Sequence, residues 1–394
     1  MSKHTYIASG VRTAIGRFGG SLAGLSPCDL AASVAAEAMT RAGIAPSEVQ
    51  QVVFGNVIHT APEDMYLSRV AAIRAGVPAE APALTLNRLC GSGLQAVVSG
   101  HEQIQLGNAA CALVGGAENM SRAGHLLQSA RFGAKMGDVT GVDMMTGALT
   151  DPFGNGHMGV TAENVADKAG IDRETQDAFA VESHRRAAAA IDAGHFREQI
   201  LPLTVRAGRK EVSFDTDEHV RRDVTLEDMQ KLRPAFRKDG SVTAGNASGI
   251  NDGAAALVLM DEDTMQRSGA TPLGRIVAYG LGGVEPAVMG LGPVPASRQA
   301  LERAGLKPAD LDVIESNEAF AAQACAVTAE LGLDPAKVNP NGGAVALGHP
   351  IGASGAIILV KLLHELKRTG GRYGLATMCI GGGQGIAVIV EAVQ

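Results

Sequence analysis

The chain has 394 residues, of which 46% are hydrophobic and 19% charged, with 50 glycines and no tryptophan. This length predicts two or three domains, and the composition excludes a disordered or low-complexity protein. The net charge of −7 argues against nucleic acid or an anionic membrane as the main partner, while leaving room for a locally basic pocket.

Two further features bear on where the chain works. Its N-terminus shows no apolar signal segment, and no run of about eighteen apolar residues occurs, so we expect a cytoplasmic protein with no membrane partner. The five cysteines form no CxxC pair, which fits a reducing compartment and argues against a redox dithiol protein. The ten histidines show no metal-ligand spacing, so we expect no metal.

Strand and helix patterns alternate along the first third of the chain. Hydrophobic spacing predicts strands at 5–9, 49–54, 83–86 and 110–115, and helices at 29–41 and 94–106. Such alternation is typical of an α/β protein whose sheet is mostly parallel.

The last third of the chain repeats the first. The segment RAGIAPSEV at 41–49 recurs 262 positions later as RAGLKPADL. Two further pairs of segments correspond in the same order: the strand, glycine loop and helix around Cys90 with 348–366, and the strand at 112–116 with 376–382. Three ordered matches predict a duplicated half, each copy being one α/β layer.

Composition changes between the two copies. The connecting segment is rich in Met and Gly at first, then has a polar helical stretch at 171–193, and then a charged stretch. We therefore predict three parts: a first half at 1–118 plus 250–270, an inserted loop domain at 119–249, and a second half at 271–394.

Cys90 is the candidate nucleophile. It lies between a predicted strand and a predicted helix, where unpaired N–H groups and the helix dipole favour the thiolate. Gly91 and Gly93 would let a substrate approach closely. A lone free cysteine is more often a small buried hydrophobe, so this stretch by itself leaves both interpretations open.

Three other positions stand out. His349 follows a Gly-rich loop that mirrors Cys90 in the second copy, so packed halves would bring imidazole and thiol together; a structural histidine is the alternative. Cys379 precedes Gly381 in a turn whose N–H groups suit an oxyanion or phosphate, unless it is a plain tight turn. Asn317 follows a predicted strand, where α/β sheets place ligands, although a helix N-cap is equally natural.

Taken together, the segments NRLCGSGLQAV, NEAFAAQ, GGAVALGHPIGASG and CIGGGQG resemble the motif set of the thiolases, the acetyl-CoA C-acyltransferases. The resemblance runs the full length and includes HMGVTAEN and TAGNASGINDGAAA in the middle. Two segments, GNVIHTAPEDMYLSRVAA and DEHVRRDVTLEDMQKLRPAF, are most similar to the bacterial β-ketothiolases of broad chain length that feed polyhydroxyalkanoate synthesis.

The resemblance implies the thiolase fold. Two duplicated βαβαβ-type halves would form a five-layer α-β-α-β-α core with an inserted loop domain, assembled as a homotetramer, a dimer of dimers, through a loop at about 126–138. The implied activity is a ping-pong Claisen condensation of acetyl-CoA with acetyl-CoA or a short acyl-CoA to a 3-ketoacyl-CoA, and the reverse thiolysis. Coenzyme A thioesters would be the substrates, and no cofactor is implied.

By the same resemblance, Cys90 accepts the acyl group as a thioester and His349 takes its proton. Cys379 is the base that removes a proton from the α-carbon of acetyl-CoA. Asn317 orients a water that, with His349, holds the enolate oxygen, and the N–H groups of Cys90 and Gly381 hold the oxygen of the acylated cysteine. These roles suit the chemistry, because a carbanion forms beside a thioester whose oxygen must be stabilised.

For coenzyme A, the resemblance points to one set of residues: Arg221, Ala244 and Ser248, with Leu149, His157, Met158 and Phe320 lining the pantetheine and acyl region. Arg221 falls in a locally basic stretch, 206–238, where nine Lys and Arg stand against seven Asp and Glu. Such a stretch fits either an anion-binding surface or a solvated face.

Two other functions share this fold. A non-catalytic thiolase-like carrier of acyl-CoA or lipid would lack Cys90, His349 or Cys379, and all three are present. A decarboxylating ketoacyl synthase would need a second histidine where this chain has Cys379. The sequence leaves the direction of the reaction and the range of acyl chains open.

Overall fold

The computed structural model describes residues 4–393 and is built on one large sheet. Nine strands follow each other across it in the order β15-β16-β17-β14-β1-β13-β5-β3-β4, and two short strands pair beside this path. Their bounds are β1 (Thr5–Thr13), β2 (Gly16–Arg17), β3 (Gln51–Gly55), β4 (Ala83–Leu86), β5 (Cys111–Asn119), β10 (Ile200–Leu201), β13 (Asn251–Asp261), β14 (Gly274–Gly283), β15 (Val313–Ser316), β16 (Tyr373–Ile380) and β17 (Gln384–Glu391).

The strand order repeats in two halves. In the first, β3 pairs in parallel with β5, followed by antiparallel pairs with β13 and then β1; in the second, β15, β16, β17 and β14 repeat this pattern. In the second half, the place of β4 is taken by a single parallel bridge between Val338 and Ile314 of β15. The halves join edge to edge through antiparallel β1 and β14. The predicted duplication is confirmed.

The predicted mostly parallel sheet is wrong, because most neighbouring pairs are antiparallel. Strands linked by helices do run parallel, as β3 and β5 do. However, β17 follows β16 after a turn of three residues, which permits only antiparallel pairing. In the first half β13 takes the corresponding place after the long insertion, and it runs antiparallel to both neighbours.

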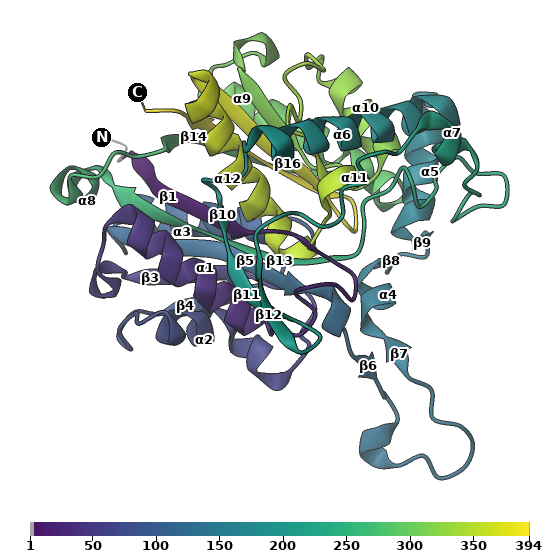
Figure 1. Ribbon diagram of the computed structural model, residues 1–394, viewed down its shortest axis with the longest axis horizontal. Helices are drawn as coiled ribbons and strands as arrows, with labels where there is room; N and C mark the ends of the chain where they lie inside the picture. Colours follow the sequence, from purple (N-terminus) through teal and green to yellow (C-terminus); the bar gives the residue numbers. More distant parts are fainter. Residues whose placement is uncertain (1–3, 394) are drawn as a thin grey trace.

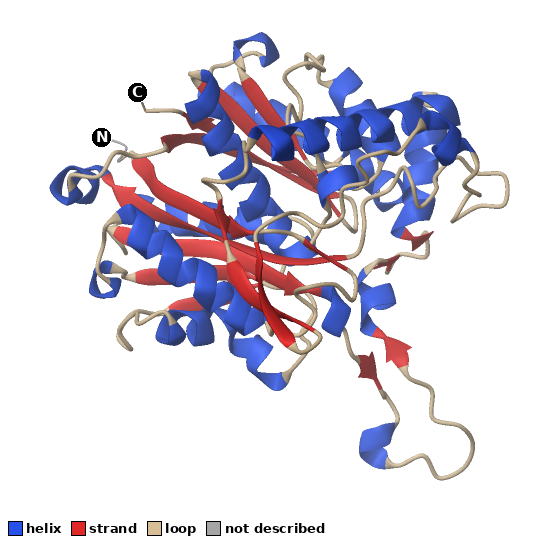
Figure 2. Cartoon of the chain, in the orientation of Figure 1, coloured by secondary structure: helices blue, strands red, loops and turns tan. Residues whose placement is uncertain are grey.

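Helices form the other layers of the core (Figure 2). α1 (Pro27–Ala42) and α2 (Leu67–Arg74) cover the first half, and α9 (Pro293–Ala304) covers the second. α3 (Ser92–Gln105) and α12 (Ile351–Thr369) pack against each other between the halves. In Figure 1 the first half, purple to blue, lies below the second, green to yellow.

The two central helices touch at glycines near their N-termini. A Cβ on Gly93 would lie 2.7 Å from the backbone nitrogen of Ala356, and one on Gly355 would clash with the backbone nitrogen of Leu94. Only glycine permits so close a crossing. Because Cys90 and His349 immediately precede these helices, the crossing brings both toward one point.

The insertion between β5 and β13 carries short hairpins and several helices. Its elements are β6 (His125–Leu126), β7 (Val142–Asp143), α4 (Met144–Ala148), β8 (Thr150–Asp151), β9 (Gly156–His157), α5 (Met158–Ala169), α6 (Arg173–Ala193), β11 (Leu203–Ala207), β12 (Lys210–Phe214) and α7 (Leu226–Gln230). The remaining helices are α8 (Glu262–Ser268), α10 (Ala321–Glu330) and α11 (Ala344–Leu347). Figure 1 shows the β6–β7 hairpin projecting from the body. Within residues 4–393, no helix has the length and apolarity to cross a membrane.

A buried ion pair ties the insertion to the core. Arg12 on β1 donates to both carboxylate oxygens of Asp217, at 2.7 and 2.9 Å, and neither side chain is exposed to solvent. Asp217 also accepts from the backbone nitrogen of Ile15 at 2.8 Å. These bonds fix the segment that carries His219 and Arg221.

We expect Asp217→Ala to lower the free energy of unfolding by about 3–5 kcal/mol, because the Arg12 charge would stay buried without a partner. Asp192→Ala is the matched control, since it removes the exposed partner of Arg222 and should cost less than about 1 kcal/mol. Urea unfolding followed by circular dichroism measures both variants. A similar, small loss in the two would contradict the anchoring role.

Candidate active site

The predicted site residues converge on one cavity of about 440 Å³, a size typical of small-molecule sites. All but one of them line it: Cys90, Leu149, His157, Met158, Arg221, Ala244, Ser248, Phe320, His349, Cys379 and Gly381. The exception is Asn317, which lines a small cavity behind His349 instead.

Cys90 stands in a tight turn between β4 and α3. The turn requires a φ of 46° at Leu89, which is unusual for a residue other than glycine. Ser92 holds it, because its hydroxyl accepts from the nitrogen of Arg88 at 2.8 Å and donates to the carbonyl of Leu89 at 2.7 Å. The position of Cys90 is thus fixed by the hydrogen bonds of its own turn.

Burial raises the pKa of the Cys90 thiol to about 11, although hydrogen bonds from the N–H groups of Gly381 and Cys90 act in the opposite direction. The thiol is therefore protonated at rest. The same two N–H groups are hydrogen-bonded to the sulfur, and their predicted role in holding the oxygen of an acyl group on Cys90 stays a prediction. Cys90 needs a base to attack, and the turn alone does not supply one.

His349 can be that base. Burial lowers its pKa to about 4, so the imidazole is neutral at physiological pH. Its Nδ1 lies 2.6 Å from the hydroxyl of Ser354, which donates its single hydrogen to the carbonyl of Pro350 at 2.9 Å. Nδ1 therefore carries the imidazole proton, and Nε2 keeps its lone pair. No residue in the described part of the chain is hydrogen-bonded to Nε2. This nitrogen is therefore free to take the proton of Cys90 during attack.

We expect Ser354→Ala to slow the reaction of Cys90 with iodoacetamide at neutral pH by roughly 10- to 100-fold. This is the usual effect of removing the residue that hydrogen-bonds the second nitrogen of a functional histidine. Without the hydroxyl, either nitrogen of His349 can carry the proton. Ser297→Ala is the control, because it removes another buried hydroxyl, bonded to Thr377, without touching the histidine. Equal rates in the two variants would show that Ser354 does not set the tautomer.

Cys379 is the second-last residue of β16 and is 1% exposed. Burial, and then the nearby Cys90, raise the pKa of its thiol, which is therefore protonated at rest. The following turn has positive φ at Gly382 and Gly383, 82° and 86°, which only glycine adopts readily. Two neutral thiols thus share one cavity with a histidine that can accept a proton.

Asn317 follows β15, and its side chain is 2% exposed. Neither its amide nitrogen nor its amide oxygen has a hydrogen-bond partner in the described part of the chain. An amide in this condition is a ready site for an ordered water. Its predicted role in holding the water of the enolate site stays a prediction.

Sequence reasoning missed the buried residues that hold the two catalytic loops together. Glu118 at the end of β5 accepts from the nitrogen of Gly352 at 2.9 Å and from that of Ile58 at 3.1 Å, and burial raises its pKa to about 8. Asn251 accepts from the nitrogen of His349 at 3.0 Å. Both lie beside another polar residue at the end of a strand whose interior is apolar, a signal that could have identified them.

Arg221 lies exposed at the rim of the cavity. Its backbone nitrogen donates to Nδ1 of the buried His184 at 3.1 Å. Its neighbour Arg222 is paired with Asp192. Among the described residues no carboxylate pairs with Arg221, so this guanidinium can bind an anionic ligand.

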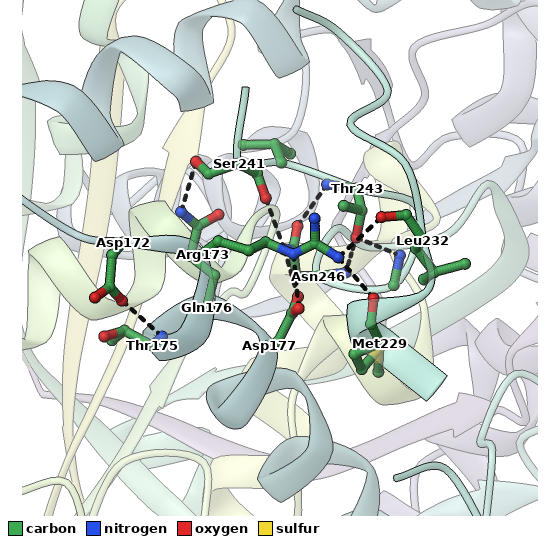
Figure 3. Close-up of polar contacts among 12 residues, drawn as sticks. Asp172, Arg173, Thr175, Gln176, Asp177, Met229, Leu232, Ser241, Thr243 and Asn246 are labelled. Atoms are coloured by element: carbon green, nitrogen blue, oxygen red, sulfur yellow. Dashed lines mark hydrogen bonds and ion pairs between the residues drawn. The ribbon is translucent and has the colours of Figure 1, made fainter. Parts of the chain in front are cut away.

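A loop at 241–248 forms another part of the rim, and the first turns of α6 hold it in place (Figure 3). Asn246 donates to a carboxylate oxygen of Asp177 at 2.9 Å. The other oxygen accepts from Arg173 at 2.6 Å, and Arg173 also donates to the carbonyl of Met229 at 2.6 Å. The loop that carries two predicted coenzyme A contacts is thus held rigidly.

The fold and this set of two thiols and one histidine are those of an acyl-transferring enzyme, and comparison with known families agrees. The description "Thiolase, N-terminal domain" matches residues 5–263, and "Thiolase, C-terminal domain" matches residues 270–392. The chain therefore belongs to the thiolase family and is an enzyme of acyl-CoA C-acyl transfer, as its motifs predicted.

Individual relatives support the same family. Over 394 residues, the full length of both chains, the protein is 62% identical to Beta-ketothiolase BktB of Cupriavidus necator. It is 52% identical over 393 residues, again all of both chains, to Acetyl-CoA acetyltransferase of Shinella zoogloeoides.

Solved structures confirm the predicted thiolase fold. The crystal structure of human mitochondrial 3-ketoacyl-CoA thiolase is 45% identical, with a TM-score of 0.97 and 99% of each chain covered. The structure of that human enzyme in complex with CoA also has a TM-score of 0.97 at 45% identity, covering 99% of this chain and 98% of that one.

Proposed function

We propose that the protein is a β-ketothiolase that condenses acetyl-CoA with acetyl-CoA or a short acyl-CoA, and cleaves the resulting 3-ketoacyl-CoA in reverse. The observation that carries this proposal is the meeting of Cys90, His349 and Cys379 in one cavity, with the lone pair of the histidine free. Acyl transfer needs a nucleophile and a base, and Claisen chemistry needs a second proton carrier.

In the first half-reaction, Cys90 attacks the thioester carbonyl while its proton passes to Nε2 of His349. The N–H groups of Cys90 and Gly381 hold the oxygen as charge develops on it. The carbon–sulfur bond of the substrate then breaks, and the departing thiolate takes the proton of Cys379. The acyl-enzyme is left with a protonated His349 and a Cys379 thiolate.

In the second half-reaction, the Cys379 thiolate removes a proton from the α-carbon of a second acetyl-CoA. His349 and a water on Asn317 hold the enolate oxygen. The carbanion attacks the acyl carbonyl, the bond to Cys90 breaks, and Cys90 regains its proton from His349. All protons are returned, so the enzyme is ready for another cycle.

The cavity walls support a broad range of acyl chains. Met120, Met158 and Met289 lie around the reactive groups. Methionine is unbranched and flexible, so a wall built from it adapts to ligands of different length. We infer a preference that extends beyond acetoacetyl-CoA, in line with the motif resemblance to broad-range β-ketothiolases that supply polyhydroxyalkanoate synthesis in the cytoplasm.

We also infer a homotetramer, built through the β6–β7 hairpin. At its tip, the side chains of Phe132 and Met136 are 89% and 97% exposed. Large apolar side chains gathered on a projecting segment mark an interaction surface. Multi-angle light scattering measures the molar mass in solution and so tests this assembly. The mass of a dimer or of a monomer would contradict the tetramer.

Cleavage of acetoacetyl-CoA, 3-ketovaleryl-CoA and 3-ketohexanoyl-CoA by free CoA tests the function, with Cys90→Ala as the control. Comparable rates on all three substrates, lost in the variant, are expected. Activity on acetoacetyl-CoA alone would overturn the broad range and keep the mechanism. No activity in a folded protein that still binds CoA would favour a non-catalytic carrier.

Arg221→Ala should raise the KM for CoA about tenfold and leave kcat unchanged, because the variant loses one charge-assisted contact to CoA. High salt should weaken CoA binding in the native enzyme for the same reason. Arg222→Ala is the neighbouring control, since Arg222 is already paired with Asp192. A KM that rises equally in both variants would show only a general charge effect.

A further inference from the structure

A second, much smaller cavity lies behind the active site. It is lined by Glu315, Ser316, Asn317, Ser354 and Lys361, all nearly inaccessible to solvent. Its free volume of about 10 Å³ is close to what a single water molecule needs. It thus adjoins both the predicted enolate site and the hydroxyl that orients His349.

Three consecutive residues that line this cavity have side-chain polar atoms without partners. Oε1 of Glu315, Oγ of Ser316 and both amide atoms of Asn317 lack hydrogen-bond partners anywhere in residues 4–393. Each side chain is at most 2% exposed. Buried polar atoms in native proteins are nearly always paired, and an ordered water serves where the protein offers no partner.

A positive charge also lines the cavity. Nζ of Lys361 on α12 donates to Oε2 of Glu315 at 2.7 Å and to the carbonyl of Gly342 at 2.8 Å. The side chains of Lys361 and Glu315 are only 3% and 1% exposed. Replacing such a buried pair by apolar residues is often neutral or stabilising, so stability gives no sufficient reason for it here.

The chemistry of the cavity selects water as its occupant. The ammonium of Lys361 repels a metal cation, and the carboxylate of Glu315 repels an anion. A water can donate to Oε1 of Glu315 and also accept from the amide of Asn317, which satisfies both groups. One water molecule bound in this way therefore gives a partner to Oε1 of Glu315 and to the amide of Asn317.

We propose that one ordered water in this cavity links Glu315 to Asn317, and that the Glu315–Lys361 pair is thereby a positioning element for the enolate site. Glu315 and Lys361 touch no substrate. They act by fixing the amide of Asn317, which in turn orients the water that holds the enolate oxygen. This inference rests on the proposed thiolase function.

The two half-reactions separate this role from a merely structural one. Acylation of Cys90 uses the N–H groups around its sulfur, whereas the carbon–carbon step uses Asn317. We expect the double variant Glu315→Gln, Lys361→Met, which removes both charges at similar volume, to be acylated by acetyl-CoA within about twofold of the native rate. Its kcat for condensation should fall roughly 10- to 100-fold, as for a misplaced catalytic group.

Glu365→Gln is the matched control. This carboxylate lies one turn further along α12, is bonded to Arg368 and Asn341, and does not line the cavity. It should leave both half-reactions unchanged. Equal loss of acylation and condensation in the folded double variant, or no loss in either, would overturn the positioning role.

A crystal structure of the native enzyme tests the water independently, including the case where the double variant fails to fold. We expect a water within hydrogen-bond distance of both Glu315 and Asn317, and an empty cavity would overturn the inference. Native enzyme that is not acylated by acetyl-CoA would instead refute the proposed function itself. A native enzyme that turns over while the double variant condenses normally refutes only the positioning role.

Discussion

Cys90→Ser is expected to lower thiolysis and condensation on the order of 10⁴- to 10⁶-fold, the scale found when a catalytic nucleophile is removed. A serine hydroxyl is far less acidic than a thiol, and the neutral His349 is too weak a base to make up the difference. Initial rates of acetoacetyl-CoA cleavage, measured against substrate concentration, give the loss in kcat.

The control for this variant is Cys325→Ser. Cys325 is a half-buried free thiol on α10 and does not line the active-site cavity. It should retain native activity, which separates loss of the nucleophile from general thiol loss. A Cys90→Ser enzyme that keeps more than a hundredth of the native rate would refute Cys90 as the nucleophile.

Cys379→Ser is expected to separate the two half-reactions. Acylation of Cys90 should persist, because a thiolate of ordinary pKa about 8.5 can depart without a proton donor. Condensation should fall by about 10²- to 10⁴-fold, the typical contribution of a positioned base, because a serine alkoxide does not form at neutral pH to deprotonate the α-carbon.

Rapid-quench measurement of acyl-enzyme and steady-state condensation, made on one preparation of this variant, tests that separation. The Cys325→Ser enzyme again serves as the reference. Loss of both half-reactions to the same degree would show that Cys379 is not a dedicated base for the carbon–carbon step.

Sequence alone predicted the duplicated halves and the place of the reactive groups for a physical reason. Cys90 is followed by Gly91 and Gly93, His349 follows a Gly-rich loop, and each precedes a helix; such local patterns survive in the sequence. Their meeting depends on the crossing of α3 and α12, which the mirrored positions indicated. The division into three parts at fixed residues stays a prediction.

The contacts that orient these groups could not be predicted, because they join segments far apart in the chain. Glu118 bonds the nitrogen of Gly352 across 234 positions, and Asn251 bonds that of His349 across 98. The antiparallel places of β13 and β17 were missed for a similar reason. The alternation of strands and helices in the sequence predicts the parallel strands. It does not predict a strand that pairs with its neighbour without an intervening helix.

The central claim is that Cys90 carries the acyl group. Incubation of the native enzyme with acetyl-CoA, without free CoA, followed by intact-mass and peptide mass spectrometry, tests it most directly. We expect the added mass of one acetyl group on the peptide that contains Cys90, lost again when free CoA is supplied. An active enzyme with no such adduct, or with the acetyl group on Cys379 instead, would contradict the account.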